Sequence, residues 1–116
     1  MRFNLLFLTT FLNLIFSLLI PFVSHTNELK YIFKSGSEGY NTFRIPSIIT
    51  TDSGVVLAFA EGRKNSSSDS GDIDLVLKRS IDGGKTWGDL IIIRDDSTNV
   101  CGNPSPVIDR DRKSVV

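Results

Sequence analysis

The chain has little of what a disulfide, a transition-metal site or a charge-driven function requires. Its 116 residues include one cysteine, Cys101, and one histidine, and its formal net charge is zero. A lone cysteine excludes an intrachain disulfide, and the absence of a His or Cys cluster leaves no readable metal or cofactor site. Zero net charge gives no field that favours nucleic acid. We therefore expect no cofactor, no metal and no nucleic-acid partner, and no protein partner can be read.

The one long apolar run lies at the N-terminus. After Met1 and Arg2, the stretch from Phe3 to Val23 is almost wholly apolar. This pattern predicts a secretory signal peptide over residues 1–24, which leaves residues 28–116 as the exported domain. An uncleaved membrane anchor is the alternative, because about 20 apolar residues can span a bilayer. Either interpretation predicts a secreted, periplasmic or cell-surface protein.

The rest of the chain lacks a long helical period and is rich in short apolar segments separated by turn residues. Segments of strand length with β-branched or aromatic residues are 31–33, 47–50, 55–60, 73–78 and 91–93. Asp52–Gly54 and Asp82–Gly84 lie between such segments and are typical of hairpin turns. An all-β, antiparallel architecture is predicted.

Residues 80–87 follow the pattern S-x-D-x-G-x-T-W. Its members are Ser80, Asp82, Gly84, Thr86 and Trp87. The Ser and Asp side chains can accept hydrogen bonds from turn N–H groups, the glycine tolerates positive φ, and the tryptophan can pack back. This explanation needs no substrate, so we interpret Asp82 as structural. The pattern resembles the Asp box, a repeat on blades of β-propellers that include sialidases but also sorting receptors.

Two further segments could carry chemistry. Phe43–Pro46 reads F-R-I-P, and by itself Arg44 would be an ordinary surface charge. Arg63 ends an apolar segment and is followed by a serine-rich stretch that contains Asp69, which by composition is a polar loop. A planar guanidinium can hold a carboxylate through two hydrogen bonds, which a lysine cannot do.

Taken together, the three motifs resemble the bacterial-type secreted exo-alpha-sialidases, also called neuraminidases, over residues 31–109. The resemblance implies the N-terminal part of a six-bladed β-propeller, about one blade and the start of the next. It implies that Arg44 and Arg63 bind the substrate, that Asp69 is the acid/base of a retaining hydrolysis of terminal sialic acid, and that sialylated glycans are the partners. Asn103, in an N-P-x-P segment, would contact the sugar.

The same resemblance implies a tyrosine nucleophile, a glutamate partner and two more arginines, none of which matches a position in residues 1–116. Tyr31 and Tyr40 precede or adjoin the first motif and do not match the nucleophile. We therefore expect the chain to be inactive alone. The alternative function is a non-catalytic Asp-box propeller for carbohydrate binding or adhesion, which would need neither Arg44 nor Asp69.

Overall fold

The computed structural model describes residues 29–109 and 114–115. The predicted signal peptide, residues 1–24, lies outside them. No helix in the described part is long and apolar enough to cross a membrane.

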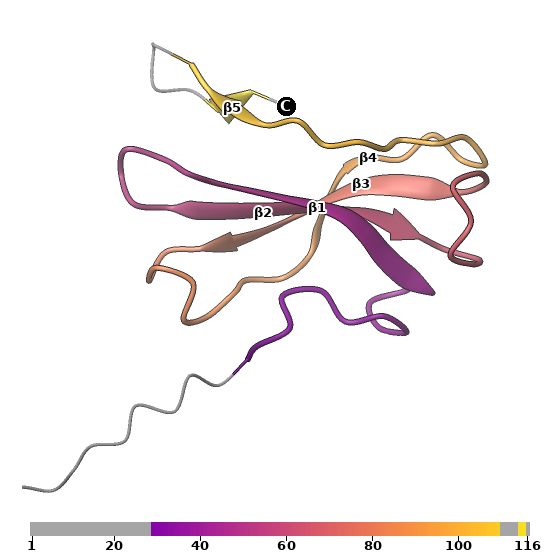
Figure 1. Cartoon of the computed structure of the whole chain (residues 1–116), viewed down its shortest axis with the longest axis horizontal. Helices are drawn as coiled ribbons and strands as arrows, with labels where there is room; N and C mark the ends of the chain where they lie inside the picture. Colours follow the sequence, from indigo (N-terminus) through magenta and orange to yellow (C-terminus); the bar gives the residue numbers. More distant parts are fainter. Residues whose placement is uncertain (1–28, 110–113, 116) are drawn as a thin grey trace, which may run out of the picture.

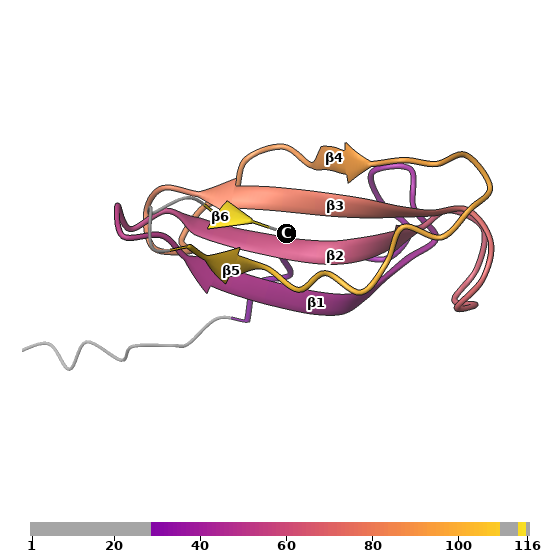
Figure 2. The ribbon, with the colours of Figure 1, turned by 90° about the horizontal axis from the view of Figure 1, so that it is seen from above.

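The fold is a four-stranded antiparallel sheet with the strand order β1-β2-β3-β4, followed by a separate two-stranded ribbon, β5-β6 (Figures 1 and 2). This confirms the predicted all-β, antiparallel architecture. The strands are β1 (Thr42–Thr50), β2 (Val56–Arg63), β3 (Ile73–Ser80), β4 (Ile91–Arg94), β5 (Val107–Ile108) and β6 (Ser114–Val115).

Both predicted turn segments connect neighbouring strands, but one predicted strand is wrong. In the β1-β2 turn the Gly54 N–H donates to the Thr51 carbonyl at 2.9 Å, and the φ of Gly54 is 81°, which glycine adopts without steric cost. Residues 31–33 are irregular. Phe33 instead packs against the core residues of the sheet, and its ring centroid lies 5.2 Å from that of Phe43. Burial of aromatic surface has therefore outweighed strand propensity there.

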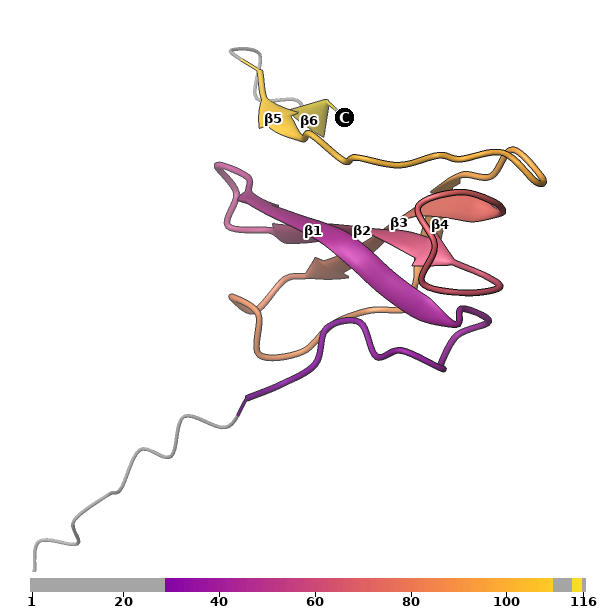
Figure 3. The same ribbon diagram turned by 45° about the vertical axis from the view of Figure 1, so that its right-hand side comes forward.

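The two faces of the sheet are covered by different segments. Residues 29–41 cross one face, and the segment leading to β5 crosses the other (Figures 1 and 3). Because side chains alternate along a strand, Ala60 and Gly62 of β2 face the first segment, whereas Phe59, Glu61 and Arg63 face the second. We call the first the Tyr40 face, because Tyr40 packs there with Ala60 and Val76 in a buried cluster. We call the second the Arg63 face.

An irregularity in β1 explains how a proline is tolerated in the F-R-I-P segment. The register with β2 shifts between Arg44 and Ser47, and Ile45 has a φ of 52°, which a β-branched residue rarely adopts. Pro46 lies in this bulge and on an edge strand, where the missing N–H is tolerated. Bulges bend a strand and redirect its side chains, and this one directly follows Arg44.

We expect Gly62→Ala to destabilise the fold. A Cβ at this position would lie 2.7 Å from Tyr40 Cδ1 and Cε1, so the buried ring must shift. Overpacking of this kind costs about 1–3 kcal/mol in the free energy of unfolding. Denaturant unfolding of the full-length gene product measures the loss. Gly88→Ala is the control, since its Cβ meets only Arg79 O at 3.6 Å, and an equal loss in both variants would contradict the packing explanation.

Candidate active site

The two arginines of the sequence motifs lie on the same face of the sheet, where β1 begins and β2 ends. Arg44 is the register partner of Glu61, and Arg63 is the partner of Thr42. Directly paired residues of antiparallel strands share a face, and so do residues two apart on one strand. Arg44, Glu61 and Arg63 therefore form one cluster on the Arg63 face.

Arg63 is buried, with 3% of its side chain exposed. Its Nε and Nη2 donate to Glu61 Oε2 at 3.1 and 2.6 Å, and Nη1 donates to the carbonyl oxygens of Ser67 and Ser68 at 2.6 and 2.7 Å. Nη2 also lies 2.7 Å from Asp69 Oδ1. These contacts account for all five N–H donors of a guanidinium. Arg63 thus holds the following loop against the sheet, and it can bind a substrate only if one of these partners is displaced.

Asp69 is brought to both arginines by the loop between β2 and β3, residues 64–72, which we call the Asp69 loop. Arg44 Nη1 donates to Asp69 Oδ1 at 3.1 Å and to the Ser67 carbonyl at 3.3 Å. The Asp69 side chain is nevertheless 81% exposed and that of Arg44 is 46% exposed. The hydrogen bond from Arg63, with the charges of Arg63 and Arg44, lowers the pKa of Asp69 below its ordinary value. Two cations and one exposed carboxylate therefore meet at this end of the sheet.

Asn103 reaches the same cluster through its backbone. Its N–H donates to Glu61 Oε1 at 2.9 Å, and its φ is 55°, in the left-handed region that asparagine tolerates better than most residues. Glu61 is buried, and because it accepts hydrogen bonds from both Arg63 and Asn103, it links Arg63 to the segment that carries Asn103. The residues that the sequence predicts for the site thus lie together, with Glu61 between two of them.

Several known proteins that are similar to this chain are named as sialidases. No family model matches it. It is 40% identical over 79 residues to an exo-alpha-sialidase of Aspergillus fumigatus, which covers 63% of this chain, and 31% identical over 85 residues to a sialidase of Micromonospora viridifaciens, which covers 70%. The solved structure of the NanB sialidase of Streptococcus pneumoniae matches 73% of the chain with a TM-score of 0.57 and 32% identity. The chain is a member of the sialidase family.

The similarity concerns only a part of those sialidases. The chain spans 20% of the Aspergillus protein, 13% of the Micromonospora protein and 13% of the NanB chain. The first of these is fungal and the other two are bacterial, so the resemblance to the sialidase family extends beyond its bacterial members.

The Asp box of this sialidase-family chain is a hydrogen-bonded turn at the far end of β3 from the arginines. Ser80 Oγ accepts the N–H of Gly84 at 2.8 Å, and Asp82 accepts both the N–H and the hydroxyl of Thr86, at 2.9 and 2.6 Å. Trp87 lies over Gly84, where a Cβ would come within 3.8 Å of the ring. All of these contacts lie within the turn, and Arg63 pairs with Ile73 at the opposite end of β3.

We expect the Asp box to make the stability of the fold acid-sensitive. The hydrogen bonds from Thr86 and Ser80 lower the pKa of Asp82 far below its ordinary value of about 3.9. A carboxyl with a lowered folded-state pKa stabilises the fold above the unfolded pKa, and this contribution is lost as the pH falls toward the folded pKa. Melting temperatures between about pH 7 and pH 3 should therefore fall less steeply in Asp82→Asn than in the wild type.

The control for that measurement is Asp89→Asn, which changes an exposed carboxylate just beyond the same turn. Its melting temperatures should follow those of the wild type over the whole pH range. If Asp82→Asn has the same pH slope as the wild type, the hydrogen bonds to Asp82 do not contribute to stability.

In the described part of the chain, three acidic residues come close enough together to suggest a cation site. Asp72, Asp74 and Asp95 each place one carboxylate oxygen within 4.8 Å of the others. The ammonium group of Lys64 lies among them, at 3.0, 3.3 and 3.3 Å from the three carboxylates. A metal ion would have to displace this internal cation, so we assign no metal to the cluster.

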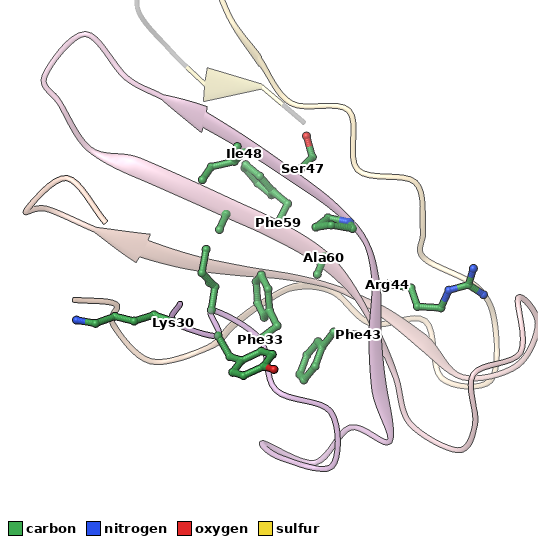
Figure 4. Close-up of a pocket in the computed structure, with 12 residues that line it drawn as sticks. Lys30, Phe33, Phe43, Arg44, Ser47, Ile48, Phe59 and Ala60 are labelled. Carbon is green, nitrogen blue, oxygen red and sulfur yellow. The ribbon is translucent and has the colours of Figure 1, made fainter. Parts of the chain in front are cut away.

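An apolar groove on the Tyr40 face is separate from the arginine cluster. It lies between residues 30–33 and strands β1 and β2, and Phe33, Phe43 and Ala60 line it. Arg44 stands at its rim, but its guanidinium points away from Phe33 and Phe43, toward the Asp69 loop (Figure 4). The groove is therefore not part of the polar cluster, which lies on the other face.

The sequence analysis assigns no role to two residues in and near the site. Glu61 lies two positions before Arg63, a spacing that puts both side chains on one face of a strand and could have identified it. Lys64 directly follows Arg63 and faces the opposite side of the sheet. Its partners come from β3 and from the segment after β4, and no sequence spacing brings these together.

Proposed function

We propose that the full-length gene product is an exo-alpha-sialidase that releases terminal sialic acid from glycoconjugates with retention of configuration. The observation that carries this proposal is the meeting of Arg44, Arg63 and Asp69 at one end of the sheet, with Asp69 Oδ1 at 3.1 and 2.7 Å from the two guanidiniums. The sialidase relatives support it. Sialic acid carries a carboxylate on its anomeric carbon, so a site for it needs both a cationic clamp and a nearby proton donor.

Substrate binding would change the pairing of Asp69. Arg44 and Asp69 are both substantially exposed, and ion pairs in such positions contribute little free energy because water screens them. The substrate carboxylate can therefore replace Asp69 on Arg44. Loss of that cation and coverage by the sugar both raise the pKa of Asp69, in the direction that a general acid requires. Asp69 then protonates the glycosidic oxygen and later accepts a proton from the incoming water.

The nucleophile would come from outside the described residues. Tyr40 does not fit this role, because its hydroxyl lies on the Tyr40 face and donates to Asp74 at 2.7 Å. Burial, together with that hydrogen bond, raises the pKa of Tyr40 above its ordinary value, whereas an attacking tyrosine needs a lowered one. We expect a tyrosine with a glutamate partner elsewhere in the protein, as in the sialidases that depart from the two-carboxylate scheme.

The proposal also covers the fold of the whole protein and its export. The four-stranded antiparallel sheet has the form of one propeller blade, and we propose that it is the first of six. Export through the N-terminal signal peptide would bring the enzyme to sialylated glycans outside the cell.

The proposal is tested with the purified full-length gene product and an aryl sialoside. We expect release of the aryl group, no release from the matching galactoside, and proton NMR spectra in which the α-anomer of sialic acid appears first. Sialoside binding without hydrolysis would favour the non-catalytic propeller, and first appearance of the β-anomer would contradict retention.

A further inference from the structure

Lys64 is surrounded by three carboxylates at the base of the Asp69 loop. Its Nζ lies 3.0 Å from Asp72 Oδ1, 3.3 Å from Asp74 Oδ2 and 3.3 Å from Asp95 Oδ2. Asp72 and Asp74 belong to the chain that enters β3, and Asp95 directly follows β4. One ammonium group therefore joins the end of β2 to two other parts of the sheet.

The same residue closes the loop through its backbone. The Lys64 N–H donates to the Asp72 carbonyl at 3.1 Å, so the two ends of the Asp69 loop are hydrogen-bonded to each other. Because adjacent residues of a strand face opposite sides, Arg63 holds the loop from one face and Lys64 from the other. The loop is thus fixed at its base by Lys64 and along its length by Arg63.

The charges show why this cation is needed. Asp74 is fully buried, and its Oδ2 accepts one hydrogen bond from the Tyr40 hydroxyl and contacts Lys64, whereas its Oδ1 is buried without a hydrogen-bond partner. The side chains of Asp72 and Asp95 are 22% and 45% exposed, so Asp74 is the one fully buried carboxylate of the three. Carboxylates this close together that lose their cation repel one another and must separate, take up protons or become hydrated. Without Lys64, three carboxylates would remain within 4.8 Å. The chain segments that carry them would then move apart, and Asp72 is the last residue of the Asp69 loop.

We propose that Lys64 is a positioning residue that delivers Asp69 to the substrate by holding the base of the Asp69 loop against Asp72, Asp74 and Asp95. This inference rests on the proposed sialidase function for its catalytic consequence, but not for the structure of the loop. Lys64 does not touch the reacting atoms. Its effect should therefore be specific to the step in which Asp69 donates a proton.

Leaving groups of different basicity distinguish this role from a general loss of structure. A sugar leaving group must be protonated as the glycosidic bond breaks, whereas 4-nitrophenolate leaves with little help from an acid. In Lys64→Met, kcat/KM for sialyllactose should fall roughly tenfold more than kcat/KM for the 4-nitrophenyl sialoside. A partly unfolded enzyme would lose both activities by the same factor, so the ratio does not depend on how much of the variant folds.

Two further variants complete the comparison. Lys64→Arg keeps a cation among the carboxylates and should bring the ratio closer to that of the wild type. Lys34→Met removes an exposed lysine on the segment before β1 and should leave the ratio unchanged. An unchanged ratio in Lys64→Met, or an equal change in Lys34→Met, would overturn the proposal.

Hydrogen exchange tests the loop without reference to activity. Backbone amides of residues 65–72 should exchange faster in Lys64→Met than in the wild type or Lys34→Met, while those of β2 remain protected. If the wild type hydrolyses neither sialoside but this difference is seen, the proposed function fails and the positioning of the loop stands. If exchange over residues 65–72 is the same in all three proteins, the positioning role is wrong, whether or not the protein is a sialidase.

Discussion

Replacement of Asp69 by asparagine should lower kcat/KM for sialyllactose by roughly 10²- to 10⁴-fold, the usual contribution of a general acid. Asparagine has nearly the same shape but cannot donate a proton to the glycosidic oxygen. The loss for the 4-nitrophenyl sialoside should be far smaller, because that leaving group departs without protonation. Steady-state kinetics on both substrates, with the full-length gene product, measure the difference.

The same variant should retain binding of the sugar. Asp69 lies on Arg44 in the structure without substrate, so its carboxylate competes with that of the ligand. We expect Asp69→Asn to bind free sialic acid at least as tightly as the wild type in calorimetry. Asp89→Asn, which changes an exposed carboxylate near the Asp box, is the matched control for both experiments. Equal losses of kcat/KM on the two sialosides would show that Asp69 is not the acid.

Replacement of Arg44 by lysine should weaken binding of sialic acid roughly 10- to 100-fold, which corresponds to the loss of one charged hydrogen bond of about 1.5–3 kcal/mol. Lysine keeps the charge but cannot offer the planar pair of donors that a carboxylate accepts. Because the side chain of Arg44 is 46% exposed, the melting temperature should change little. Calorimetric titration with sialic acid and a thermal melt on the same samples measure both quantities.

The same substitution at Arg63 should affect stability, unlike Arg44→Lys. Arg63 is buried and uses five donors on Glu61, two carbonyl groups and Asp69. Lysine has three donors, so the buried Glu61 or the carbonyl groups would be left without partners. This variant should therefore show a clearly lower melting temperature, which Arg44→Lys should not. If both variants lose affinity without losing stability, Arg63 binds substrate directly and is not mainly a structural residue.

The sheet could be predicted from the sequence because its turns are local. Asp52–Gly54 and Asp82–Gly84 are short segments with residues that accept turn geometry, and each lies between strands that pair with each other. The strand predicted at residues 31–33 is wrong because Phe33 packs against the core residues of the sheet, and such packing depends on tertiary contacts. The predicted segment 47–50 is also shorter than β1, which begins at Thr42 and contains Pro46 at a bulge.

The site could be predicted only in part. Arg44, Arg63 and Asp69 were identified from a resemblance, and their separation along the chain does not show that they meet. Their meeting depends on the pairing of β1 with β2, on the bulge after Arg44 and on a loop held by its own carbonyl groups. The Lys64 cluster could not be predicted either, because a lysine and three aspartates are by composition typical of a solvated surface.

The role of Arg44 and Asp69 is tested most directly by a crystal structure of the full-length gene product with a bound unsaturated sialic acid analogue. We predict that the ligand carboxylate lies within hydrogen-bond distance of the Arg44 guanidinium. Asp69 should have left Arg44 and should face the position of the glycosidic oxygen. A ligand carboxylate far from Arg44, with the contact between Arg44 and Asp69 intact, would contradict the proposed site.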